Sequence, residues 1–344
     1  MTEHTTGNGM ESSNMEERTF RAFVVEERES AFTGSVANRR IADLPKHGLL
    51  VRVRYSSLNY KDALSATGNR GVTRRYPHTP GIDAAGTVIA SDSAAFREND
   101  AVIVTGCGLG MNTPGGFAQF IRVPPEWAVK LPEGLSMREA MAYGTAGLTA
   151  GLCVLRLAER IRPEMGRIAV SGATGGVGSL AVAMLAKLGY RVAAITGKEH
   201  ERDKLLGLGA SEVLERKEYE AETPNALLEA EFAGAVDTLG GHVLANLLKS
   251  MQPLGVLTAC GNAASPNLAL TVYPFILRGV SLVGIDSQNC PHPLREEVWR
   301  KLAGAWKPEG LDRLCTEITL DELPASIGRI LQGKLTGRTV VQMG

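Results

Sequence analysis

The chain has 344 residues, of which 44% are hydrophobic and 22% charged, as is usual for a globular protein long enough to form two domains. Its 37 basic and 37 acidic side chains give zero net charge, which argues against general binding to nucleic acids or membrane surfaces. Five scattered cysteines form no C-x-x-C pair, so no disulfide framework or zinc finger is predicted, and a reducing cytoplasm is favoured.

The first part of the chain is predicted to be an irregular β-rich domain. Residues 1–18 are polar, which predicts a disordered tail. Short apolar segments bounded by Gly, Pro and Asp then predict strands at 21–26, 49–55, 86–90 and 101–104. Glycine and proline recur through 68–86 and 106–116, which indicates long functional loops.

The rest of the chain alternates between helix and strand. A helix is expected from about 137 to 161, interrupted by Gly144-Thr145-Ala146-Gly147, where small residues would let a ligand or strand approach closely. Strands are predicted at 167–171, 191–196, 212–214, 233–237, 256–260 and 281–285, with helices at 176–188, 199–208 and 242–251. This α/β pattern predicts a doubly wound parallel sheet.

The final segment, 294–344, is expected to form two short helices and a strand at 339–342 that return to the first domain. The predicted domains are therefore 19–142 together with 287–344, and 143–286. No run of about 20 apolar residues is present, and no basic segment precedes an apolar one at the N-terminus. Neither a membrane span nor a signal peptide is therefore expected.

The most informative segment follows the strand at 167–171 and opens the next helix. It contains the A-x-G-x-x-G form of the dinucleotide fingerprint, with Ala173 in place of the first glycine. Small residues let the backbone turn tightly and approach a pyrophosphate, whose charge lies at the helix N-terminus. The predicted cofactor contacts are Thr174, Gly175, Gly176, Val177 and Gly178.

The end of the second strand of this region predicts NADPH rather than NADH. An NAD site usually has an acidic residue there, whereas this chain reads Thr196-Gly197-Lys198. A hydroxyl, a backbone amide and an ammonium attract a 2′-phosphate. Glu199 is the contrary residue, and a solvated surface charge is the alternative for Lys198.

Two further groups are candidates for ligand contacts. Thr238, Cys260 and Gly261 end the fourth and fifth strands, where ligands of such sheets bind, with Cys260 favoured for its size rather than its thiol. Basic residues in the loop between Tyr60 and Gly81 are candidates for the phosphates of a ligand; solvated arginines are the alternative. These are Arg70, Arg74 and Arg75.

Six segments together resemble the zinc-free branch of the medium-chain dehydrogenase/reductases, and more narrowly the acryloyl-coenzyme A reductase group, often labelled quinone oxidoreductase. They are Ser57-Leu58-Asn59-Tyr60-Lys61-Asp62, Pro80-Gly81-Ile82-Asp83-Ala84-Ala85-Gly86, Gly144-Thr145-Ala146-Gly147, Gly172-Ala173-Thr174-Gly175-Gly176-Val177-Gly178, Pro274-Phe275-Ile276-Leu277-Arg278 and Gly337-Arg338-Thr339. The resemblance implies a GroES-like catalytic domain, a Rossmann domain and a cofactor cleft between them. It also implies a homodimer that pairs the strand at 281–285 with its partner.

The resemblance also implies roles for single residues. Tyr60 would contact the nicotinamide ribose or deliver a proton, the alternative being a half-buried, hydrogen-bonded tyrosine. Arg216 would face the 2′-phosphate, and the phosphates received by the loop arginines would be those of coenzyme A. Arg338 would reach the cofactor, with a structural ion pair as its equal alternative. Zinc-dependent relatives have a catalytic Cys and a Gly-His-Glu segment where this chain reads Asn59-Tyr60-Lys61-Asp62 and Gly81-Ile82-Asp83, so no metal is expected.

The sequence thus predicts NADPH-dependent reduction of the C=C bond of a short 2-enoyl thioester, such as acryloyl-CoA to propanoyl-CoA. Hydride would go to the β-carbon and a proton, from Tyr60 or water, to the α-carbon, with backbone N–H groups stabilising the enolate. Two alternatives remain open. One is quinone or 2-alkenal reduction on the same scaffold, and the other is a catalytically silent NADPH-binding protein that acts by interaction.

Overall fold

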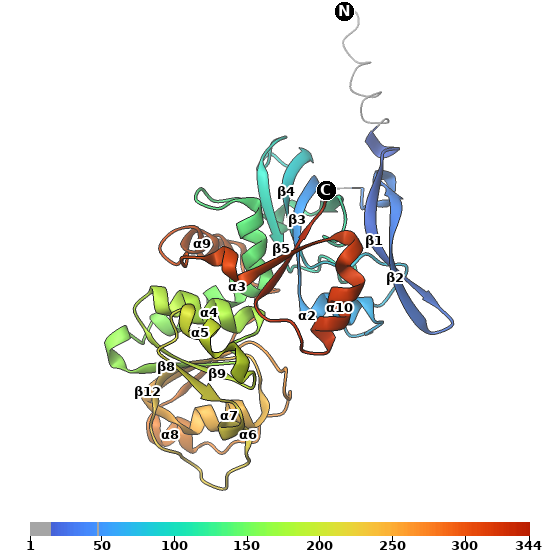
Figure 1. The fold of residues 1–344 in the computed structure, drawn as a ribbon. Helices are drawn as coiled ribbons and strands as arrows, with labels where there is room; N and C mark the ends of the chain where they lie inside the picture. Colours follow the sequence, from blue (N-terminus) through green and yellow to red (C-terminus); the bar gives the residue numbers. More distant parts are fainter. Residues whose placement is uncertain (1–14, 47) are drawn as a thin grey trace, which may run out of the picture. The chain divides into compact units, whose positions relative to one another are not determined.

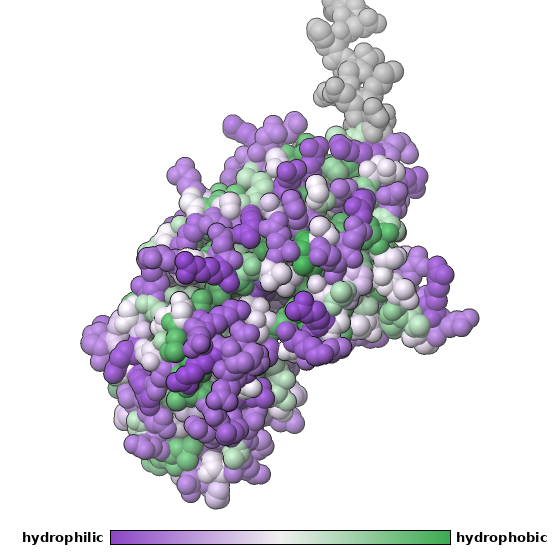
Figure 2. All heavy atoms as spheres, in the orientation of Figure 1, coloured by the Kyte–Doolittle hydropathy of each residue, from purple (hydrophilic) through white to green (hydrophobic). Residues whose placement is uncertain are grey.

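The computed structural model describes residues 15–46 and 48–344 and divides the chain into two compact units. The first unit contains the described residues up to Thr145 together with Cys315–Gly344, and the second runs from Ala146 to Leu314. The β-rich unit and the parallel-sheet unit confirm the predicted fold class. Hydrophilic side chains dominate the face in Figure 2, and apolar side chains form smaller patches on it.

The first unit is built from a seven-stranded sheet and a separate antiparallel hairpin (Figure 1). The sheet order is β14 (Cys315–Thr319), β15 (Arg338–Gln342), β3 (Leu49–Leu58), β4 (Asp83–Ala90), β5 (Ala101–Thr105) and β7 (Ala128–Lys130), with β6 (Phe120–Val123) paired to β3. The hairpin consists of β1 (Thr19–Arg28) and β2 (Ala31–Arg40). Two helices, α2 (Tyr60–Ala66) and α10 (Leu323–Leu331), pack side by side.

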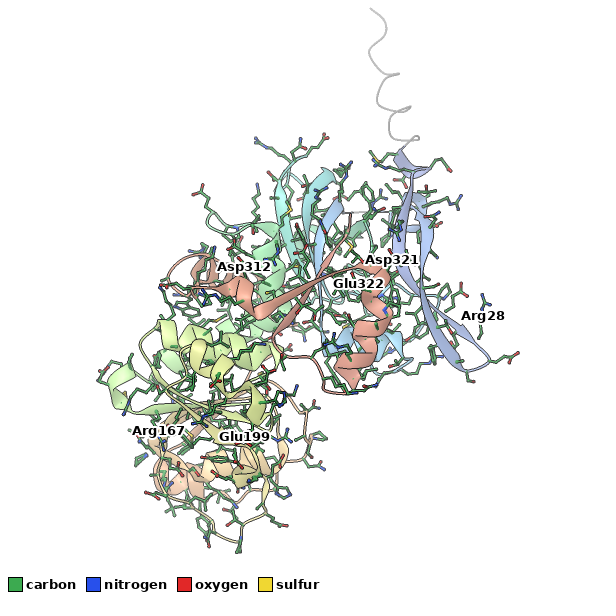
Figure 3. All side chains as sticks on the ribbon, in the orientation of Figure 1. Arg28, Arg167, Glu199, Asp312, Asp321 and Glu322 are labelled. Atoms are coloured by element: carbon green, nitrogen blue, oxygen red, sulfur yellow. The ribbon has the colours of Figure 1, made fainter. Side chains whose placement is uncertain are left out.

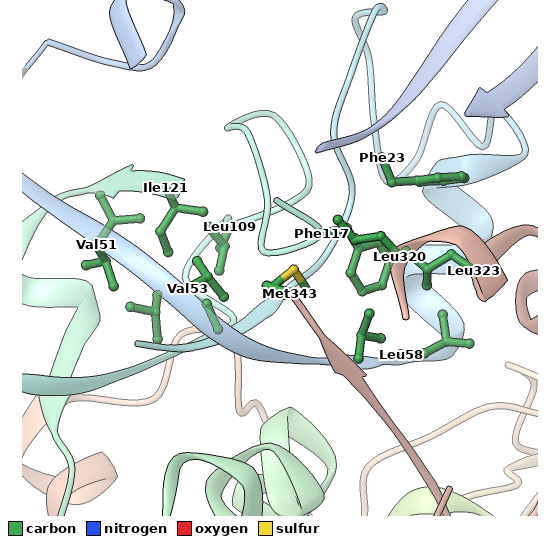
Figure 4. Close-up of a cluster of buried hydrophobic side chains, with 14 of the residues drawn as sticks. Phe23, Val51, Val53, Leu58, Leu109, Phe117, Ile121, Leu320, Leu323 and Met343 are labelled. Atoms are coloured by element: carbon green, nitrogen blue, oxygen red, sulfur yellow. The ribbon is translucent and has the colours of Figure 1, made fainter. Parts of the chain in front are cut away.

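Alternation along β3 shows why this sheet has a buried face. Val51 and Val53 lie in the core with Phe117 and Leu323 (Figure 4), whereas Arg52 between the two valines is exposed. Side chains of a strand point to opposite faces, so this period of two buries Val51 and Val53 and leaves Arg52 between them in water. Leu50, on the same face as Arg52, is buried in a second cluster with Phe20 and Phe120.

The second unit contains a six-stranded, all-parallel sheet covered by helices. Its order is β10 (Glu212–Glu215), β9 (Arg191–Thr196), β8 (Arg167–Ser171), β11 (Phe232–Asp237), β12 (Met251–Ala259) and β13 (Ser281–Gly284). The helices of this unit are α4 (Gly176–Lys187), α5 (Arg202–Gly207), α6 (Lys217–Glu220), α7 (Gly241–Lys249), α8 (Tyr273–Arg278) and α9 (His292–Ala303). The strand order reverses beside β8, the point at which doubly wound sheets bind ligands.

Short 3-10 helices connect several of these elements. They are η1 (Ile41–Asp43), η2 (Pro125–Trp127), η3 (Pro163–Met165), η4 (Glu199–Glu201), η5 (Leu311–Leu314) and η6 (Leu320–Glu322).

The long helix α3 (Met137–Ala158) passes from one unit into the other and is broken at Gly144, whose φ of 53° and ψ of −154° are not helical. Among the described residues, α3 is also the one helix long and apolar enough to cross a membrane by length and composition. In this structure 83% of its apolar window is buried, as in the core helix of a globular domain.

Two parts of the N-terminal region differ from the prediction. Strand β2 was not predicted because its sequence contains no apolar run, and its pairing with β1 sets Val36 opposite Phe23 of the core. Residues 15–18 of the predicted tail form contacts: Glu16 pairs with Arg122 at 2.6 Å. Residues 1–14 lie outside the described part of the chain.

The domain boundaries also differ from the predicted ones, because α9 belongs to the second unit. Its buried residues Arg295, Val298, Trp299 and Leu302 recur at the helical spacing of one face. A Cβ built on Gly151 of α3 would lie 2.6 Å from Val298, so the two helices pack closely. The return to the first unit therefore begins at Cys315 rather than at residue 287.

Candidate active site

The turn between β8 and α4 forms the predicted dinucleotide loop. Gly172 has a φ of 60°, and a Cβ there would lie 2.2 Å from Thr238 Oγ1. A Cβ on Gly178 would lie 2.3 Å from the Gly172 carbonyl oxygen, so the helix reaches the strand only because glycine occupies both positions. Gly175 is the N-cap of α4, whose first N–H groups have no intrahelical acceptor. This cradle fits a pyrophosphate.

Other predicted cofactor residues lie at the same edge of the sheet, because β9, β8, β11 and β12 are neighbours. The hydroxyls of Thr174 and Thr196 form a hydrogen bond of 3.3 Å, and Thr238 Oγ1 donates a hydrogen bond to the Ser171 carbonyl at 3.0 Å. A Cβ on Gly261 would lie 2.4 Å from the Thr238 carbonyl oxygen.

Cys260 lies at this edge as a thiol rather than a thiolate. A hydrogen bond with Cys153 raises the pKa of the Cys260 thiol, and burial raises it further. The role of Cys260 as a small residue beside the cofactor stays a prediction.

Two cations gather where β9 ends. The Lys198 N–H donates to Thr196 Oγ1 at 3.0 Å, and a Cβ built on Gly197 would lie 3.0 Å from the Arg216 guanidinium carbon. Burial lowers the pKa of Lys198; Glu201 opposes this, and the positive charges of Lys204 and Arg216 add to it. A phosphate dianion here would relieve the repulsion between these cations. Arg216 also pairs with Glu220 at 2.6 Å.

The contrary residue, Glu199, begins η4 directly after Lys198 and is labelled in Figure 3. Its negative charge raises the pKa of Lys217, although an ion pair with Glu215 is the larger cause. Glu199 therefore acts on at least one cation outside the predicted phosphate site.

The first unit contains a buried polar cluster around Asp83, which is 0% exposed. Ser57 Oγ donates to the Asp83 carboxylate at 2.6 Å and Asn59 Nδ2 at 2.7 Å. Thr145 donates twice, from its backbone N–H at 3.0 Å and from its hydroxyl at 2.5 Å. Hydrogen bonding among Ser57, Asp83 and Thr145 was not predicted from the sequence. Asp83 could have been recognised in the sequence as a carboxylate within an apolar strand. A carboxylate that is buried with such a strand must form hydrogen bonds or an ion pair.

Arg338, 3% exposed, completes this cluster. Its guanidinium lies 3.9 Å from Asp83, and both Ser57 and Asn59 bridge the pair by accepting N–H groups of Arg338 at 2.8 and 3.1 Å. Arg338 Nε donates to the Ala142 carbonyl at 3.1 Å. Burial lowers the pKa of Arg338, whereas Asp83 opposes that shift. These contacts match the ion-pair alternative, and contact with a cofactor remains a prediction.

The break in α3 serves the same cluster. A Cβ on Gly144 would lie 2.4 Å from Asp83 Oδ2 and 2.5 Å from Ser57 Oγ, and the positive φ also favours glycine. Small residues at this break were predicted to let a ligand or strand approach closely. In the structure, Gly144 instead leaves space for the side chains of Asp83 and Ser57. Because the helix restarts after Gly144, the N–H of Thr145 points at a carboxylate, which stabilises a helix N-terminus.

The segment that begins α2 contains Tyr60 between two structural residues. Asp62 accepts the backbone N–H groups of Asn59 at 2.8 Å and Ile82 at 2.8 Å, which fixes the loop. Burial, followed by the charge of Asp83, raises the pKa of Asp62 to about 7. Tyr60 itself is 55% exposed, and its hydroxyl has no hydrogen-bond partner within the described residues. This exposure differs from the half-buried alternative and leaves the hydroxyl available to a ligand.

The three loop arginines do not form one group. Arg70 donates to Glu27 at 2.5 Å and to the Arg74 carbonyl at 2.9 Å, and its guanidinium lies over the Tyr76 ring at 5.3 Å. Its side chain is therefore held by the protein. Arg74 and Arg75 are exposed and line a cavity that is described below.

The residue types at the two segments that hold zinc in related enzymes suit a polar network rather than a metal. Asn59 and Asp83 hydrogen-bond to each other and to other protein groups. Across residues 15–46 and 48–344 no group of three His, Cys, Asp or Glu side chains could hold a metal ion.

We therefore expect elemental analysis of the purified protein to find no stoichiometric zinc, and chelators such as EDTA to leave turnover intact. Enzyme purified from zinc-supplemented medium is the appropriate control. One tightly bound zinc per chain would contradict this prediction.

Comparison with known proteins agrees with this geometry. Residues 45–133 match the family described as alcohol dehydrogenase GroES-like domain, and residues 176–304 match the one described as zinc-binding dehydrogenase. The putative quinone oxidoreductase YhfP of Bacillus subtilis is 44% identical over 94% of this chain and 99% of its own length. The probable acrylyl-CoA reductase AcuI of Escherichia coli is 43% identical with the same coverage.

Two crystal structures are similar throughout. The yhdH oxidoreductase of Salmonella enterica, in complex with NADP, has a TM-score of 0.92 and 44% identity, covering 94% of this chain and all of its own. The yhfP protein of Bacillus subtilis, with NAD bound, has a TM-score of 0.93 and 44% identity, covering 95% of this chain and all of its own.

A GroES-like unit joined to a Rossmann unit with a glycine-rich dinucleotide loop defines a medium-chain dehydrogenase/reductase, and the chain belongs to this family of oxidoreductases. Within it, the chain belongs to the group that contains the acryloyl-CoA reductases and YhfP. Both assignments confirm the resemblance seen in the sequence.

Proposed function

We propose that the protein is a cytoplasmic, NADPH-dependent reductase that converts a short 2-enoyl thioester, acryloyl-CoA, to its saturated product, propanoyl-CoA. The observation that carries this proposal is the similarity over nearly the whole chain to proteins named as acrylyl-CoA reductases, 43% and 42% identical. The five cysteines are free thiols, in keeping with a reducing compartment.

The cations at the end of β9 support NADPH as the cofactor. Lys198 and Arg216 lie close to each other beside Gly197, so both could bind a 2′-phosphate there, and no acidic residue occupies the strand end itself. The similar Salmonella protein was crystallised with NADP, whereas the Bacillus protein holds NAD. Cofactor preference is therefore worth measuring directly, as described in the Discussion.

The chemistry follows from a conjugated carbonyl. NADPH, when bound, supplies the hydride that adds to the β-carbon, and the electron pair of the C=C bond moves toward the thioester oxygen. Backbone N–H groups would stabilise the resulting enolate. A proton then bonds to the α-carbon, from the exposed hydroxyl of Tyr60 or from water.

Quinone or 2-alkenal reduction is the second candidate, favoured by the name of the 44% identical YhfP. A catalytically silent NADPH-binding protein is the third. NADPH oxidation with acryloyl-CoA, a quinone, a 2-alkenal and buffer alone separates all three. We expect the highest kcat/KM with acryloyl-CoA; a higher value with quinone or alkenal supports the second candidate, and no turnover supports the third.

We also propose a homodimer formed through β13, which lies at the edge of the six-stranded sheet. Leu282 on this strand is 36% exposed, and Ile276 and Leu277 on α8 are 66% and 63% exposed. An open edge with apolar side chains favours pairing with a second copy.

Replacing Leu282 and Ile276 with lysine should convert a dimer to a monomer, because charges would be buried at the interface. Light scattering should then give the chain mass of 36.6 kDa instead of twice that mass. The matched control is Leu206→Lys, an exposed leucine of α5. A wild-type monomer, or a double variant that remains dimeric, would contradict this interface.

A further inference from the structure

A cavity of about 480 Å³ lies in the first unit, between the β1–β2 hairpin and the loops that follow α2 and β5. Its apolar lining includes the buried rings of Phe20 and Phe120. Its basic lining comes from two places far apart in the sequence: Arg39 and Arg40 end β2, and Arg74 and Arg75 belong to the loop before Gly81.

The charges that line this cavity are unbalanced. Four guanidinium groups face one carboxylate, that of Asp43, which lies 3.3 Å from Arg40 and 4.0 Å from Arg39. The guanidinium groups of Arg74 and Arg75 have no hydrogen-bond or ion-pair partner in the described part of the chain. Cations grouped beside a hollow attract an anion.

The surrounding groups strengthen this positive field. Arg18 and Arg52 lie over the Phe120 ring at 5.2 and 5.7 Å. His78, which also lines the cavity, hydrogen-bonds with the Gly110 carbonyl at 2.9 Å, and burial lowers its pKa. Its ring is therefore neutral near pH 7, and the arginines supply the positive charge.

The guanidinium groups beside this cavity fit a phosphorylated ligand. Guanidinium groups bind phosphates in a bidentate manner, and the volume is in the usual range of ligand cavities. We propose that this cavity binds the phosphorylated nucleotide end of the thioester substrate. The assignment of the ligand to the thioester rests on the proposed function.

The cavity lies near the buried Asp83 cluster of the first unit. Thr79 lines it and precedes Asp83 by four residues, so their Cα atoms are at most about 14 Å apart. The Thr79 carbonyl accepts the Gly115 N–H at 2.8 Å, which ties this segment to the neighbouring loop. The flexible pantetheine arm of a coenzyme A thioester spans a distance of this order.

Titration calorimetry with adenosine 3′,5′-bisphosphate tests the site itself. Saturating NADP⁺ is present throughout, so that the cofactor site is filled. We expect the variant Arg39→Gln/Arg74→Gln/Arg75→Gln to lose at least about tenfold in affinity, since each charged contact contributes modestly. The matched control, Arg28→Gln/Arg54→Gln/Arg97→Gln, removes three exposed arginines of the same unit that do not line the cavity. It should bind as wild type does.

Kinetics with acryloyl-CoA and acryloyl-pantetheine, which lacks the nucleotide, tests the source of the ligand. The cavity variant should lose about tenfold or more in kcat/KM for acryloyl-CoA and keep its activity on acryloyl-pantetheine. Retained activity on the shorter thioester also shows that the variant folds.

The outcomes separate the cavity from the reaction. No bisphosphate binding by wild type, or equal binding by both variants, overturns the nucleotide site. Binding that depends on the cavity arginines, together with equal kcat/KM of wild type for the two thioesters, overturns the thioester assignment and indicates a free nucleotide. If neither thioester is reduced, the proposed function fails, and arginine-dependent binding still supports the nucleotide site.

Discussion

Replacing Arg338 with methionine is expected to lower the free energy of unfolding by about 3–5 kcal/mol, the usual cost of removing one partner from a buried ion pair. Methionine keeps much of the side-chain length but leaves the carboxylate of Asp83 buried without its cation. Ser57 and Asn59 would also lose the hydrogen bonds that they accept from the N–H groups of Arg338. Urea unfolding followed by circular dichroism measures this loss.

The matched control is Arg138→Met, because Arg138 forms an ion pair with Glu317 at 2.6 Å in the same unit, with both side chains about one-third exposed. We expect that variant to lose no more than about 1 kcal/mol. The double variant Asp83→Asn/Arg338→Met should be more stable than Arg338→Met alone, because no uncompensated charge remains. A loss below about 1 kcal/mol for Arg338→Met would contradict the structural role of this pair.

Replacing Lys198 with alanine is expected to weaken NADPH binding by about 1.5–3 kcal/mol, the usual contribution of a hydrogen bond to a charged group. NADH lacks the 2′-phosphate, so its affinity should change little. Because Lys198 is partly exposed, salt should screen its attraction for the phosphate, and the loss should shrink as salt is raised. Fluorescence titration with both cofactors, at low and high salt, measures these effects.

Two further variants sharpen this test of the phosphate site. Arg216→Ala should weaken NADPH binding in the same direction, because Arg216 lies beside Gly197. Glu199→Gln should leave NADPH binding equal or stronger, since it removes the contrary negative charge. A wild-type enzyme that uses NADPH and NADH equally well would show that the cations at the end of β9 do not select the cofactor.

The sequence was sufficient to predict the dinucleotide loop of the second unit and the strands beside it, because their signals are local, whereas the place of α9 in this unit was not predicted. The strands 167–171 and 191–196 were predicted with the bounds of β8 and β9. Buried parallel strands are short apolar runs, and a glycine-rich turn must follow a strand that leads to a phosphate-binding helix. These features depend on residues only a few positions apart, so the dinucleotide loop could be recognised before any tertiary contact was known.

The tertiary structure alone decided which distant residues meet. Arg338 and Asn59 are 279 positions apart, and their hydrogen bond depends on β15 pairing with β3. The arginines of β2 and those of the loop before Gly81 share one cavity only because the β1–β2 hairpin folds against that loop. Local sequence periodicity does not predict contacts between such distant residues. These contacts follow from strand register and from the requirement that buried charges be paired.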